Sequence, residues 1–89
     1  MEDLAPTIKL VMKNFCQALS NEVLKKIKLG MTPTEIQIPR LTYDALNHYF
    51  DRHFYETSGM GFSIQPNKEL NLLGVLIVPG DIDAKWILA

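Results

Sequence analysis

The sequence predicts an α+β fold: a small mixed or antiparallel sheet of about four strands with two helices, in the order α-β-α-β-β-β. Apolar residues recur every three or four positions in residues 4–30 and 40–56, which is typical of amphipathic helices. Short apolar stretches bounded by Pro and Gly indicate strands. With 47% hydrophobic and 21% charged residues, the composition is that of a globular protein, so we expect a single domain over residues 1–89.

The first predicted helix extends from Leu4 to Gly30. Asp3 can cap its start, and Gly30 can adopt the left-handed conformation that ends many helices. Its first apolar stripe consists of Leu4, Ile8, Val11, Met12, Phe15 and Leu19. Beyond Ser20 the apolar residues lie at a different angle around the helix, and these are Val23, Leu24 and Ile27. We therefore expect either a kink near Ser20 or a second buried surface, which suggests a partner.

A short strand and a second helix are predicted next. Residues 34–38 alternate between polar and apolar side chains and lie between two prolines, which indicates a strand with one wet face at a sheet edge. Ile36 and Ile38 should point to the core. The second helix begins at Arg40 or Thr42 and ends at Glu56, before a turn over residues 58–61. Its core stripe is Leu46, Phe50 and Phe54.

Three strands are predicted in the C-terminal third, at residues 62–64, 72–78 and 84–88. Residues 72–78 are apolar throughout, which is typical of a central strand covered on both faces. Its six large aliphatic side chains are worth about 1.5–3 kcal/mol each when buried, yet two helices can cover only one face. We therefore predict a homodimer or higher oligomer. The candidate contact residues are Val23, Leu24, Ile27, Tyr55 and Trp86.

The second helix contains the strongest candidate for a metal site. Asp44, His48 and Asp51 are spaced at i, i+4 and i+7 and share a helix face. No cysteine or second histidine pair is available to complete a tetrahedral shell, so a solvated helix face is the favoured interpretation. Cys16 lies beside the apolar stripe of the first helix, and burial is favoured over a nucleophilic role. We predict no catalytic, cofactor-binding or metal-binding residues.

The charges are nearly balanced and differ weakly between the two parts of the chain. The net charge is −1; residues 1–30 carry five lysines against three acidic residues, and residues 31–89 carry four basic against seven acidic residues. This weak asymmetry does not favour nucleic acid as a partner. The single cysteine, the acidic N-terminus and the lack of an apolar run of about 18 residues predict a cytoplasmic protein that does not bind membranes.

Residues 34–88 combine a Thr-Glu-Ile-Gln-Ile-Pro strand, a tyrosine-containing helix and a Leu-Gly-Val-Leu-Ile-Val-Pro strand before a short terminal strand. This pattern resembles small bacteriophage-encoded proteins of unknown function, and the resemblance implies a viral accessory or structural role. We expect a small non-enzymatic protein–protein interaction or assembly module, without a cofactor, whose partners are itself and another protein. The alternative is a small metal-binding or hydrolytic domain that uses Asp44, His48 and Asp51.

Overall fold

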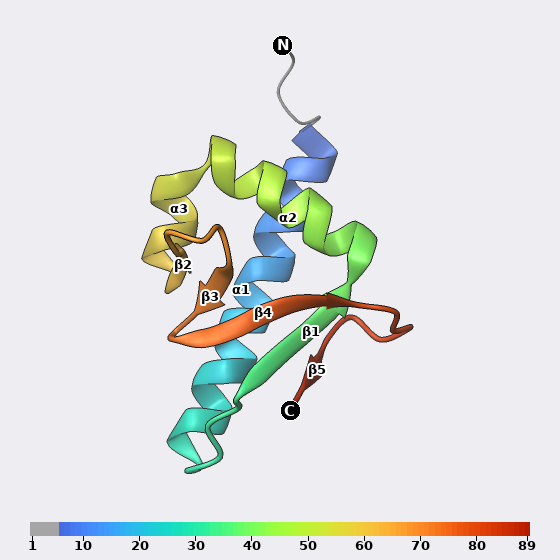
Figure 1. Cartoon of the computed structure of the whole chain (residues 1–89). Coiled ribbons are helices and arrows are strands. Elements are labelled where there is room, and N and C mark those ends of the chain that lie inside the picture. Colours follow the sequence, from blue (N-terminus) through green and yellow to red (C-terminus); the bar gives the residue numbers. More distant parts are fainter. Residues whose placement is uncertain (1–5) are drawn as a thin grey trace.

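The helices of this protein lie on one face of a mixed sheet (Figure 1). The structure is a computed structural model that describes the backbone of residues 6–89 and the side chains of residues 9–89. The helices are α1 (Pro6–Lys28), α2 (Arg40–Arg52) and α3 (Phe54–Gly59). The strands are β1 (Glu35–Pro39), β2 (Phe62–Ile64), β3 (Leu70–Leu72), β4 (Val75–Gly80) and β5 (Ile87–Leu88). The α+β class is confirmed, with one more helix and one more strand in these residues than the sequence predicts.

The sheet has the strand order β2-β3-β4-β1-β5. Strands β1 and β4 are parallel, and all other neighbours are antiparallel. Because β5 pairs with β1, β1 is not the edge strand that its flanking prolines suggest. The predicted terminal strand over residues 84–88 is reduced to the two residues of β5. The buried strand residues, which point toward the helices, are Ile36, Ile38, Phe62, Leu70, Leu72, Val75 and Ile77.

The apolar run over residues 72–78 is not one strand. Leu73 and Gly74 have φ angles of 53° and 83° and form the two-residue turn of the β3–β4 hairpin, in which Leu72 pairs with Val75. A two-residue turn with two positive φ angles usually carries Asn-Gly or Asp-Gly, so the leucine concealed it in the sequence. The prediction of a strand buried on both faces is therefore wrong for the single chain. Leu76 and Val78 of β4 are half-buried on the face without helices.

Helix α1 is uninterrupted over the described residues and continues through Ser20. Its core-facing stripe consists of Met12, Phe15, Cys16, Leu19, Val23 and Ile27. These residues lie on one helical face, which also includes the buried Ser20. Val11, which the sequence analysis assigns to the stripe, is exposed. The predicted shift of the stripe is therefore wrong. The predicted cap Asp3 lies outside the described residues.

The C-terminal end of α1 follows the prediction. Gly30 has a φ of 78°, and the amide of Met31 donates to the carbonyl of Lys26 at 2.9 Å. The Gly30 amide donates to the carbonyl of Ile27, also at 2.9 Å, which completes a Schellman motif. Within residues 6–89, no helix has both the length and the apolar character needed to cross a membrane.

The predicted second helix is divided into α2 and α3 at His53. The Tyr49 hydroxyl, which is buried in α2, donates to the Glu56 carboxylate in α3 at 3.1 Å. Burial and the Glu56 carboxylate raise the pKa of Tyr49 to about 12, so the phenol stays protonated at neutral pH. The break moves Phe54 out of the core, where it is 52% exposed, so its prediction as a core residue is wrong.

Helix α3 is attached to the rest of the core by α1. The buried Ser20 hydroxyl donates to the main-chain carbonyl of Met60 at 2.8 Å, directly after the last residue of α3. The Thr57 hydroxyl is also buried, and it donates a hydrogen bond shared between the main-chain carbonyls of His53 and Phe54. These contacts set the direction of the chain as it enters β2.

Candidate interaction surfaces

The C-terminal end of α1 leaves apolar and basic side chains exposed together. Leu24, Leu29 and Met31 are 39%, 63% and 51% exposed. Two lysines, Lys25 and Lys28, are exposed beside them. We call this surface the basic end, and define it as Leu24, Lys25, Lys26, Lys28, Leu29 and Met31. Lysines at this position complement the negative end of the helix dipole, which gives them a structural role as well.

Two hollows lie at the basic end. The first, of about 350 Å³, is lined by Asn21, Leu24, Lys25, Lys28 and Leu29. The second, of about 300 Å³, is lined by Lys26, Met31, Thr32, Pro33, Leu88 and Ala89. Among these described lining residues there are three lysines and no Asp or Glu side chain. The surface therefore combines apolar contact area with a positive potential.

A larger hollow, of about 540 Å³, is lined by five polar or charged residues and one apolar residue. We call it the acidic hollow, and it is lined by Asp44, Asn47, His48, Asp51, Ile64 and Lys68. Helix α2 supplies the first four residues, and the β2–β3 hairpin supplies the other two. Asp44 and Asp51 are exposed, His48 is half-buried and Ile64 is an exposed apolar side chain. The hollow thus offers two carboxylates, one amine, one amide, one imidazole and one apolar side chain.

The spacing of Asp44, His48 and Asp51 correctly predicts that they share a surface, because all three line the acidic hollow. Within the described chain, however, no three His, Cys, Asp or Glu side chains are close enough to hold a metal ion. Cys16 is fully buried in the core, and this burial raises the pKa of its thiol to about 12. A thiol with that pKa stays protonated at neutral pH, which does not suit a nucleophile.

The predicted contact residues have different positions in the structure. Val23 is completely buried and Ile27 is partly buried against the core, so both contribute to packing within the chain. Trp86 is also partly buried, with its ring 5.6 Å from that of Phe15 in an edge-to-face arrangement. Leu24 and Tyr55 remain accessible, and Tyr55 is 90% exposed. Sequence reasoning missed Leu29 and Met31, although both flank the helix-ending Gly30 and lie outside the apolar stripe.

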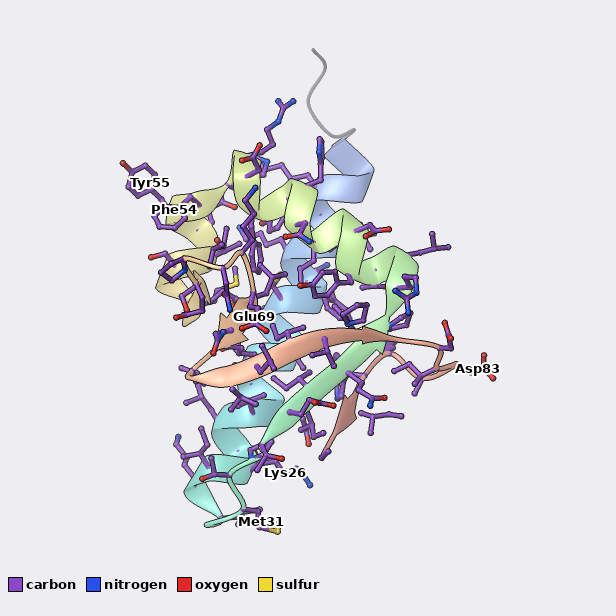
Figure 2. The ribbon with its side chains drawn as sticks, viewed as in Figure 1. Lys26, Met31, Phe54, Tyr55, Glu69 and Asp83 are labelled. Atoms are coloured by element: carbon purple, nitrogen blue, oxygen red, sulfur yellow. The ribbon has the colours of Figure 1, made fainter. Side chains whose placement is uncertain are left out.

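Two further surfaces have exposed apolar groups. Phe54 and Tyr55 lie with their ring centres 6.0 Å apart, and Figure 2 shows both pointing away from the body of the protein. The face of the sheet without helices carries the half-buried Leu76 and Val78 and the exposed Ile87. Polar residues lie among these apolar residues in the strand register, namely Glu35 and Gln37 of β1 and Asn71 of β3. That face is therefore less apolar than the run over residues 72–78 suggests.

Comparison of the chain with protein-family models, with curated proteins and with solved structures finds no significant match.

Proposed function

We propose that this protein is a small non-enzymatic assembly module that associates with copies of itself. The observation that supports this most strongly is the basic end, where three large apolar side chains are exposed together beside two hollows. Single exposed apolar residues are ordinary on protein surfaces, whereas groups of them rimmed by polar residues are typical of interaction sites. A bacteriophage accessory or structural protein, as the sequence resemblance implies, is a natural setting for such a module.

The apolar groups of the basic end favour weak, reversible association. Fully burying a Leu or Met side chain is worth about 1.5–3 kcal/mol, and here part of that burial already exists within the chain. Dissociation constants from millimolar to micromolar correspond to about 4–8 kcal/mol. Burial of Leu24, Leu29 and Met31 is the main favourable contribution, and the loss of translational and rotational freedom on association offsets part of it. We therefore expect association in the micromolar to millimolar range.

The face of the sheet without helices is a second surface for the same function. Leu76, Val78 and Ile87 would be covered if two copies packed face to face. Glu35 lies within that face, and its carboxylate accepts a hydrogen bond from the side-chain amide of Gln37 at 3.4 Å. A face-to-face dimer would therefore have to desolvate this carboxylate. Such desolvation opposes association unless a partner charge is supplied. The basic end is therefore the preferred contact surface.

Replacing Leu24 and Leu29 together with serine tests the proposal. In size-exclusion chromatography with light scattering, we expect the wild-type mass to exceed the monomer mass of 10.1 kDa and to rise with concentration. The double variant should stay monomeric with an unchanged circular dichroism spectrum, because neither side chain belongs to the core. Leu41→Ser is the matched control, since Leu41 is 84% exposed but lines neither hollow. A wild-type protein that stays monomeric, or a double variant that associates normally, would overturn the proposal.

A further inference from the structure

We propose that assembly is head-to-tail, with the basic end of one copy seated in the acidic hollow of the next. This inference rests on the proposed self-association and specifies which surfaces meet. It identifies the occupant of the basic end as a second copy of the same chain. The charges, the apolar contacts and the placement of the two surfaces each support it.

The two surfaces have complementary charge. The basic end has Lys25, Lys26 and Lys28, and no acidic side chain lines its described hollows. The acidic hollow has Asp44 and Asp51 against a single lysine. Exposed ion pairs contribute little individually, but groups of opposite charge orient the two partners and exclude arrangements in which like charges meet. In this pairing, lysines from the N-terminal part of the chain meet acidic residues from the C-terminal part.

Each surface also offers apolar contact. Leu24 and Leu29 are exposed at the end of α1, and the acidic hollow contains the exposed side chain of Ile64. The hollow is larger than either of those at the basic end, so it has room for side chains of a neighbouring copy. Aliphatic groups that meet at the centre of a ring of charges match the usual anatomy of an interface, with an apolar core and a polar rim.

The placement of the surfaces favours an intermolecular contact. The protein measures 42 × 27 × 26 Å, and the end of α1 projects at the lower tip in Figure 1, whereas α2 crosses the upper part. In Figure 2, Lys26 and Met31 mark that tip, and the hairpin residue Glu69, which follows the hollow residue Lys68 in sequence, lies above them near the middle of the view. One copy therefore cannot bring its own two surfaces together. A repeated head-to-tail contact leaves one free surface at each end, so it continues into a chain or closes into a ring.

Two charge-reversal variants test the inference by complementation. Lys25→Glu with Lys28→Glu makes the basic end acidic, and Asp44→Lys with Asp51→Lys makes the acidic hollow basic. All four side chains are exposed, so both variants should keep the wild-type circular dichroism spectrum. In light scattering at low salt, we expect each variant alone to associate at least about tenfold more weakly than the wild type. An equimolar mixture should regain association, because each reversed surface then meets its complement.

The possible outcomes separate this inference from the proposed function. If the wild type associates and both variants associate equally well, or if the mixture stays monomeric, the head-to-tail contact is overturned while self-association stands. If the wild type itself is monomeric, both proposals fail. Lys9→Glu with Lys13→Glu is the matched control, since it makes the same charge change on α1 away from the basic end. It should associate like the wild type, and added salt should weaken association of both.

Discussion

Replacing Phe50 with alanine is expected to lower the free energy of unfolding by about 3–5 kcal/mol, since large-to-small changes of core aromatics leave a cavity. Phe50 is 1% exposed and packs edge-to-face against Phe62, with ring centres 4.9 Å apart. It therefore links α2 to β2, the first strand of the hairpin region. Urea denaturation, monitored by circular dichroism, measures this change in the free energy of unfolding.

Phe54→Ala is the matched control for this prediction. If α2 continued through His53, Phe54 would follow Phe50 by one helical turn and share its buried face. The break at His53 instead leaves Phe54 half-exposed beside Tyr55. Its replacement should change the free energy of unfolding by about 1 kcal/mol or less. Equal losses from the two replacements would contradict the break between α2 and α3.

Replacing Gly61 with alanine is expected to lower the free energy of unfolding by about 1–2 kcal/mol, chiefly because the backbone there is left-handed. Gly61 has a φ of 96°, a conformation that side chains disfavour. An added Cβ would also lie within 2.5 Å of the Leu73 Cδ2, so the Leu73 side chain would have to move. The Gly61 carbonyl accepts a hydrogen bond from the Leu73 amide at 2.9 Å, which keeps the two segments close.

The control for Gly61 is its neighbour Gly59, the last residue of α3. A Cβ at Gly59 would meet nothing within 4 Å, and the backbone there does not have a positive φ. Gly59→Ala should leave stability unchanged or raise it by up to about 1 kcal/mol, because alanine restricts the unfolded chain. If Gly61→Ala were as stable as Gly59→Ala in urea denaturation, the left-handed backbone at Gly61 would be contradicted.

The elements with strong local signals could be predicted from sequence. The alternation around Ile36 and Ile38 identified β1, and Gly30 identified the end of α1. The turn at Leu73 was concealed because leucine is uncommon where φ is positive, and only the pairing of β3 with β4 requires that turn. The break at His53 has no glycine or proline either. It is accompanied by contacts between distant groups, such as that of Ser20 with Met60.

Part of the acidic hollow could also be predicted, because it depends on a local pattern within one helix. Helical spacing is enough to place Asp44, His48 and Asp51 on one surface. Ile64 and Lys68 join them only because the β2–β3 hairpin packs beside α2, which no local pattern reveals. On α1, apolar residues cover much of the circumference, so periodicity alone could not separate the buried set from the exposed one. The single buried stripe includes Cys16, whose burial the sequence predicts, and continues through the buried polar residue Ser20, which carries no apolar signal.

The most direct test of self-association through the two ends of the protein is a dilution series followed by ¹⁵N–¹H correlation spectra, from millimolar to micromolar protein at low salt. We predict concentration-dependent shifts in two groups of amides, residues 21–31 at the basic end and residues 44–51 and 64–68 around the acidic hollow. Both groups should move together, because each copy uses one surface of each kind. Spectra that do not change on dilution, or shifts confined to the face of the sheet without helices, would contradict this account.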